Sequence, residues 1–107
     1  MMDKTWKRIE RRVAELLGGV RVPVSGRQRG DSPDVMHPVF SIEVKHREKL
    51  PEWLFDAMQQ ADASNRGDQI PLVILHQKGM PVSMSFAVVR LSDLIALNHK
   101  AESWDMR

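Results

Sequence analysis

A carboxylate and an ammonium group stand two residues apart in the segment FSIEVKHREK, residues 40–49. The first half of this segment alternates apolar and polar residues, which predicts a half-buried strand ending near residue 46. Glu43 and Lys45 fall on its polar face. A carboxylate beside an ammonium group can bind a metal ion and orient a water molecule, whereas the plain alternative is a solvated strand face.

A second carboxylate precedes this strand. Asp34 opens a short strand-like stretch, and His37-Pro38 predicts a tight two-residue connection to the strand that follows. With that turn, Asp34 is expected to pair with Ser41 and to lie diagonal to Glu43 on the same face of the sheet. The plain alternative is that Asp34 is simply a turn residue after proline.

A third acid belongs to the first predicted helix, residues 4–17, which Gly18-Gly19 closes. Glu10 falls at the edge of the apolar stripe of this helix, whereas Glu15 falls on the opposite face. An inward carboxylate costs free energy unless a positive group compensates it, and a metal ion shared with the other two acids would do so. The alternative is a surface residue at the edge of the stripe.

The donor types indicate which metal ion such a site would take. The chain has no cysteine, and its histidines show no ligand spacing, so the three carboxylates form a hard oxygen site. Mg²⁺ fits this donor set best, because it binds a few carboxylates and keeps several water molecules. A hydrated Mg²⁺ beside Lys45 suits the hydrolysis of phosphodiester bonds.

Pro33-Asp34 followed by Glu43-Val44-Lys45 resembles the motif of the PD-(D/E)xK nucleases. Glu10-Arg11 in the first helix and Ser25-Gly26 in the next loop are similar to elements of the branch that includes archaeal and phage Holliday junction resolvases. The resemblance covers roughly residues 4–90.

The resemblance implies a set of metal ligands and a catalytic lysine. Asp34 and Glu43 would hold Mg²⁺ with help from the Val44 carbonyl, and Glu10 would bind it directly or through water. Mn²⁺ is expected to substitute for Mg²⁺. Lys45 would act on the attacking water molecule.

The same resemblance implies further residues around the site. The loop serine, Ser25, would lie near the scissile phosphate. A glutamine of the second helix would approach the site; Gln60 is preferred to Gln59, and the choice stays open. The residues expected to grip DNA phosphates are Ser25, Arg27, Arg29, His46, Arg47 and Lys49.

The composition of the chain limits the classes of protein to which it can belong. With 107 residues, 42% of them apolar and 28% charged, the chain is expected to form one globular domain, residues 1–107. It shows no secretory signal and no apolar run long enough to span a membrane, so we expect a cytoplasmic protein of a bacterium or a phage-infected cell. Residues 1–50 carry a net charge of +4 and residues 51–107 one of −2, which favours a polyanionic partner.

The predicted order of elements gives an α/β fold, with a small mixed central sheet flanked by helices as in a restriction-endonuclease-like core. The tail, about 99–107, is expected to be flexible. The predicted helices span residues 4–17, 51–64 and 93–98, and the predicted strands span 20–24, 34–36, 39–46, 71–76 and 84–90.

The function expected from these observations is a Mg²⁺-dependent endonuclease that resolves branched DNA. Because a junction needs two cuts and one chain has one site, a homodimer is expected. A nicking, homing-type or flap-cutting nuclease of the same fold is nearly as compatible. A non-catalytic DNA-binding module and a structural or protein-interaction domain are the alternatives from other classes.

Overall fold

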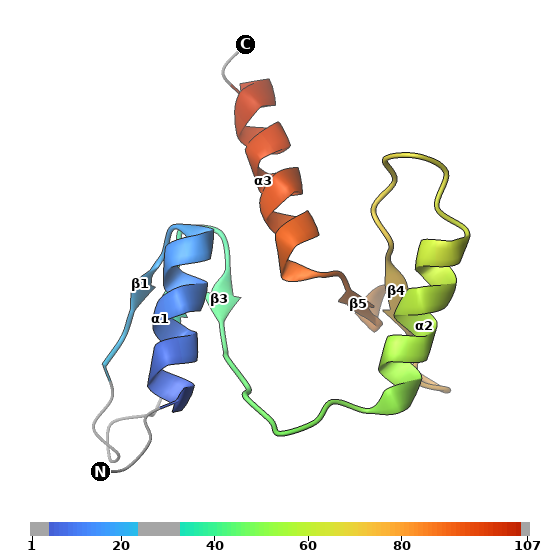
Figure 1. Cartoon of the computed structure of the whole chain (residues 1–107), viewed down its shortest axis with the longest axis horizontal. Helices are drawn as coiled ribbons and strands as arrows, with labels where there is room; N and C mark the ends of the chain where they lie inside the picture. The colour runs from blue at the N-terminus through green and yellow to red at the C-terminus, as the bar shows by residue number, and fades with distance from the viewer. Residues whose placement is uncertain (1–4, 24–32, 106–107) are drawn as a thin grey trace. The chain divides into compact units, whose positions relative to one another are not determined.

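The computed structural model describes residues 5–23 and 33–105, and the chain divides into two units, Met1–Glu48 and Lys49–Arg107 (Figure 1). The described part of the first unit contains α1 (Thr5–Leu17), β1 (Val20–Arg21), β2 (Val35–Met36) and β3 (Ser41–Ile42). The described part of the second contains α2 (Glu52–Ala63), β4 (Val73–Leu75), a 3₁₀ helix η2 (Val82–Met84), β5 (Phe86–Val88) and α3 (Leu91–Asp105).

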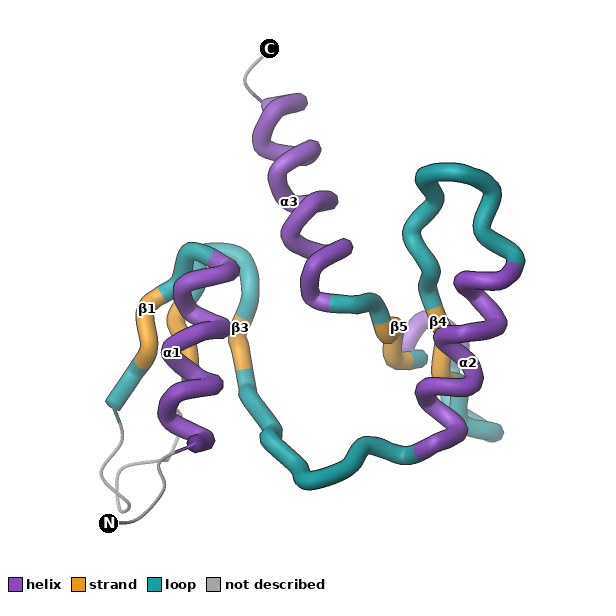
Figure 2. The backbone as a smooth tube through the Cα atoms, in the orientation of Figure 1, coloured by secondary structure: helices purple, strands orange, loops and turns teal. Residues whose placement is uncertain are grey.

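The α/β class predicted from the sequence is confirmed. Helices and strands follow in the predicted order, and Figure 2 shows them as short strands between longer helices. The described strands form two small antiparallel sheets, β1-β2-β3 in the first unit and β4-β5 in the second. A single mixed central sheet and a single domain remain predictions.

The first helix ends where its sequence predicts. Gly18 adopts a left-handed conformation, with φ of 76°, directly after Leu17. The Gly19 N–H then donates to the Ala14 carbonyl at 2.9 Å, which is the Schellman arrangement that satisfies a terminal carbonyl. Two glycines therefore turn the chain from α1 directly into β1.

Gly19 also allows β2 to approach the end of α1. A Cβ atom at this position would lie 2.5 Å from the Met36 carbonyl oxygen and 2.8 Å from a methyl group of Val35. Val35 is fully buried, and α1 packs against β1 and β2 around it. The small core of the first unit thus depends on the lack of a side chain at residue 19.

The predicted two-residue turn at His37-Pro38 is wrong. In the structure Met36 pairs with Ser41 and Val35 with Ile42, so four residues, 37–40, connect β2 to β3. The predicted pairing of Asp34 with Ser41 is therefore displaced by two residues.

The His37 ring explains the longer turn. Its Nδ1 accepts hydrogen bonds from the backbone N–H groups of Val39 at 3.1 Å and Phe40 at 3.3 Å, so Nε2 carries the proton and donates to the Leu17 carbonyl at 3.1 Å. The ring also stacks on Phe40, with 5.1 Å between the ring centroids. One side chain thus ties the β2–β3 turn to the end of α1.

In the second unit, α2 begins at Glu52, one residue after the predicted start at Pro51, and packs against β4. Met58 is its buried residue. Strands β4 and β5 pair antiparallel, with Ile74 opposite Ala87. Both strands are shorter than predicted, and Met84, predicted to begin the second of them, belongs instead to the 3₁₀ helix η2.

The last helix is longer than predicted. It begins at Leu91, where the Asp93 and Leu94 N–H groups both donate to the Arg90 carbonyl at 3.0 Å, and it runs for 15 residues to Asp105. It therefore includes most of the segment predicted as a tail. Residues 99–105 contain neither glycine nor proline, so nothing in the sequence stops the helix.

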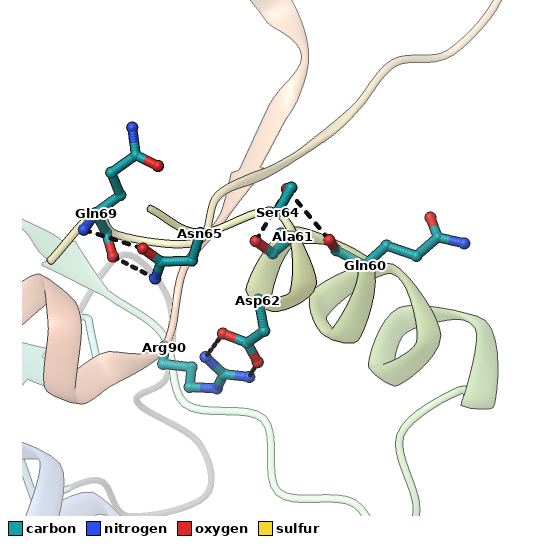
Figure 3. A network of polar contacts seen from close by, with 7 residues as sticks. All are labelled: Gln60, Ala61, Asp62, Ser64, Asn65, Gln69 and Arg90. Atoms are coloured by element: carbon teal, nitrogen blue, oxygen red, sulfur yellow. Dashed lines mark hydrogen bonds and ion pairs between the residues drawn. The ribbon is translucent and has the colours of Figure 1, made fainter. Parts of the chain in front are cut away.

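A polar network holds the loop after α2 and joins that helix to the start of α3 (Figure 3). The Asn65 side chain donates to the Gln69 carbonyl at 2.8 Å and accepts from the Gln69 N–H at 3.2 Å, which closes the loop. Arg90 donates to both carboxylate oxygens of Asp62, at 3.0 Å in the contact with Oδ1. Such a bidentate pair fixes the relative orientation of the two side chains as well as the distance between them.

This ion pair predicts a pH dependence. The hydrogen bond from Arg90 lowers the pKa of the Asp62 carboxyl, and Asp62 raises the pKa of Arg90. A carboxyl whose pKa is lower in the folded state stabilises the fold above its unfolded pKa of about 4 and loses that contribution as the pH falls further. The Tm difference between wild type and Asp62→Asn is therefore expected to shrink from pH 7 to pH 3. Asp56→Asn on the same helix is the control, and an equal, pH-independent difference for both variants would contradict the account.

Candidate functional site

Asp34 directly precedes β2, the middle strand of the three-stranded sheet. Its side chain and backbone are buried, with 7% of the residue exposed. Its carbonyl accepts from the Val22 N–H at 2.9 Å, which continues the β1–β2 ladder. Its N–H donates to the Ile42 carbonyl at 2.9 Å, and Ile42 is also the residue opposite Val35 in the strand register. Two residues of one strand therefore lie opposite one residue of the other, as in a β-bulge.

The carboxylate of Asp34 reaches the motif that follows β3. Its Oδ2 accepts a hydrogen bond from the Val44 N–H at 2.7 Å. The acid thus takes the place of a backbone acceptor just where the strand ends, and it lies beside the peptide group that joins Glu43 to Val44. The register was mispredicted, but Asp34 and the Glu43-Val44-Lys45 motif do come together.

Glu43 and Lys45 are solvent-exposed beyond the end of β3. Their side chains are 53% and 65% exposed, and Lys45 Nζ lies 3.9 Å from Glu43 Oε2. The strand predicted to continue to His46 ends instead at Ile42. Both side chains are therefore open to solvent, while Asp34 anchors the backbone between them.

Glu10 faces inward, as the helix pattern predicts, and only 7% of it is exposed. Its compensating charge is Arg21 of β1, whose Nε donates to Glu10 Oε1 at 2.8 Å. The two side chains are 10% and 16% exposed, so the ion pair is largely removed from water. Arg21 also lies 5.9 Å from the centroid of the Trp6 ring.

The role of Arg21 as the partner of Glu10 was not predicted from the sequence. The sequence does contain a signal for this pair. A lone arginine within the apolar stretch VRV, next to a helix with an inward acid, predicts an ion pair. The metal ion expected to compensate Glu10 is not needed for that purpose.

The donor chemistry of the site fits a metal ion held by two carboxylates. Within residues 5–23 and 33–105, no three acidic or histidine side chains are grouped so that they could hold a metal ion. The Asp34 carboxylate accepts from the Val44 N–H, and Glu43 is the residue before Val44; Mg²⁺ is commonly bound by one or two carboxylates and several waters. Glu10 already has one oxygen engaged by Arg21, so a role as a metal ligand remains a prediction.

The structure describes only some of the other predicted site residues. Ser25, Arg27 and Arg29 lie outside the described residues. His46 and Arg47 are exposed after the motif, and Arg47 Nη1 donates to the His46 carbonyl at 3.2 Å. Lys49 and Gln60 are exposed residues of the second unit, so their approach to the Asp34 site remains a prediction.

Comparison with known proteins finds no relative: no family model, no curated protein and no solved structure matches the chain. None of the helices in the described part of the chain has both the length and the apolar character needed to cross a membrane.

Proposed function

We propose that this chain is a Mg²⁺-dependent DNA endonuclease of the PD-(D/E)xK type that hydrolyses phosphodiester bonds in branched DNA. The observation that carries the proposal is the hydrogen bond from the Val44 N–H to the buried Asp34 carboxylate. It brings an acid 10 residues away in sequence to the Glu-x-Lys motif, in the order that the motif requires.

Each residue of the site has a distinct role in this proposal. Asp34 and Glu43 would hold the metal ion through carboxylate oxygens, with help from the Val44 carbonyl. Bound Mg²⁺, or Mn²⁺ in its place, supplies charge neutralisation at the phosphate and a water molecule of lowered pKa. The Lys45 ammonium, exposed and 3.9 Å from Glu43, orients that water and stabilises negative charge that develops on the phosphate.

The proposal includes a homodimer, because a junction is resolved by two cuts and each chain holds one site. Apolar side chains on the second unit remain exposed and are the proposed interface residues. Trp53 and Phe55 are each 56% exposed, and Leu97 is 49% exposed.

A non-catalytic DNA-binding module is the second candidate. The observation that favours it is that two of the three acids have structural partners, Glu10 with Arg21 and Asp34 with the Val44 N–H. A nicking or homing-type nuclease of the same fold differs only in the DNA that it cuts.

The test is cleavage of a four-way junction and of a linear duplex of matched sequence, each with Mg²⁺ and with EDTA. Paired, symmetric cuts in the junction alone, lost with EDTA, are the expected result. Equal cleavage of the duplex would keep the nuclease and remove the junction assignment. Binding of both DNAs without cleavage would favour the non-catalytic module.

A further inference from the structure

Strand β5 has a free edge. In the described part of the chain, β4 and β5 form a two-stranded sheet, and β5 pairs with no other strand (Figure 1). Because the backbone groups of a strand point alternately to its two sides, some N–H and C=O groups of β5 point away from β4. The outer edge of β5 is therefore a place where a further strand can be added.

The segment that leads into β5 carries no charge. Residues 79–89, GMPVSMSFAVV, contain no acidic or basic side chain, although 28% of the chain is charged. Proteins usually protect an edge strand from pairing with charged residues or proline, and β5 itself has neither. The outer edge of β4 does have such protection, because Pro71, two residues before that strand, lacks an N–H group. The β5 edge is thus the less protected of the two.

Large apolar side chains lie exposed along the same segment. The exposed fractions are 74% for Val82, 63% for Met84 and 75% for Phe86. Met84 and Phe86 also line a pocket of about 220 Å³, together with Leu75. Phe86 alone offers roughly 110 to 190 Å² of the about 800 Å² that each chain buries in a standard interface, since an aromatic side chain buries about 150 to 250 Å² when fully covered. Apolar surface gathered in this way marks an interaction site.

The strand is complementary to a second copy of itself. Ala87 is the middle residue of β5 and is exposed. Two β5 strands that pair antiparallel about a two-fold axis at Ala87 place Phe86 of each copy opposite Val88 of the other. Phe86 and Val88 point to the same face of the sheet, because they are two residues apart, and an aromatic residue opposite a β-branched one stabilises a strand pair. Since the segment is uncharged, no like charges oppose this pairing.

We propose that β5 is an interface strand that pairs antiparallel with β5 of a second copy of this chain, with Ala87 at the two-fold axis. The two β4–β5 sheets then form one sheet of four strands, within the commonest range of about four to six. The contact is closed, because both β5 edges are used and only the β4 edges, protected by Pro71, remain. The proposal rests on the proposed function for its need of two copies, and it adds β5 to the exposed helix residues already proposed at that interface.

The test measures the mass of the full chain in solution by sedimentation velocity, over a series of concentrations and without DNA. Wild type is expected to be a dimer. Ala87→Lys and Ala87→Glu are each expected to weaken the dimer by at least about 10-fold, because two like charges then meet at the axis. An equimolar mixture of the two variants is expected to restore it, because a positive charge then faces a negative one.

A matched control and a second measurement make the test specific. Ala63→Lys and Ala63→Glu make the same changes at an exposed alanine at the end of α2 and should leave the dimer unchanged, while circular dichroism checks that every variant keeps its fold. Ala87→Cys tests the register without adding charge. Directly opposed residues of antiparallel strands lie about 4.5 to 5.5 Å apart at Cα, within the range of a disulfide. Because the chain has no cysteine of its own, diamide should oxidise the two thiols to a disulfide between the copies in Ala87→Cys and not in Ala63→Cys.

A wild type that is monomeric at every concentration, a dimer that Ala87→Lys leaves unchanged, or a mixture that does not restore the dimer would each overturn the proposal. These measurements do not depend on catalysis. A dimer that depends on Ala87 but does not cleave DNA in Mg²⁺ would leave the interface standing while the nuclease proposal fell. Cleavage in Mg²⁺ by a chain that stays monomeric would do the reverse.

Discussion

Asp34→Asn is expected to lower the rate of DNA cleavage in Mg²⁺ by at least about 100-fold while the protein stays folded. Asparagine keeps an oxygen that can accept the hydrogen bond from the Val44 N–H, so the connection at the end of β3 is preserved. It lacks the negative charge through which Asp34 is proposed to bind the metal ion. Single-turnover cleavage and thermal unfolding, measured on the same preparation, separate these two effects.

Asp34→Ala provides the contrast, because it removes both the charge and the acceptor. It is expected to lose activity equally and to lose about 1 to 3 kcal/mol of stability as well, since the Val44 N–H is left without its partner. Asp56→Asn, an exposed change on α2, is the control for removal of a carboxylate. Full cleavage by Asp34→Asn would exclude Asp34 from the catalytic site.

The second large effect is expected at the Glu10–Arg21 ion pair. Glu10→Leu or Arg21→Leu leaves one charge largely buried without its partner, which costs about 3 to 5 kcal/mol. The double variant removes both charges and is expected to be more stable than the two single losses together predict. Urea unfolding of the four proteins gives the coupling free energy directly.

The exposed pair Arg12–Glu15 is the matched control, because its separation is 3.0 Å and its side chains are 65% and 66% exposed. Its coupling is expected to be about 0.2 to 1 kcal/mol, as for other solvent-exposed pairs. A single variant that is too unstable to fold, together with a folded double variant, would itself demonstrate the coupling. Equal couplings for the two pairs would mean that the Glu10–Arg21 pair is not a buried anchor of α1.

The sequence allowed the elements of the site to be predicted because they follow from periodicity. The apolar stripe of α1 placed Glu10 inward, and the Gly18-Gly19 pair predicted the end of that helix. The alternation before Glu43 predicted a strand, although the regular pairing covers only Ser41–Ile42. Periodic patterns report which side of an element faces the core, not how far its ladder extends.

The register of β2 with β3 and the pairing of Glu10 with Arg21 could not be predicted from periodicity. The turn between β2 and β3 depends on hydrogen bonds from the backbone to the His37 ring, and such side-chain contacts leave no periodic signal. Likewise, the pairing of Arg21 with Glu10 depends on how closely β1 passes α1. These features follow from tertiary contacts, which a local pattern does not contain.

The measurement that tests the central claim most directly is cleavage of the four-way junction in Mg²⁺ by wild type and by Lys45→Ala, with Lys78→Ala, a change at an exposed lysine of the second unit, as the matched control. The Lys45 side chain is 65% exposed, so its removal should not disturb the fold. We expect paired cuts by wild type and by Lys78→Ala, and a loss of at least about 100-fold in Lys45→Ala. Equal cleavage by all three proteins would show that Lys45 is not part of the catalytic site, and absence of Mg²⁺-dependent cleavage by wild type would contradict the assignment as a junction endonuclease.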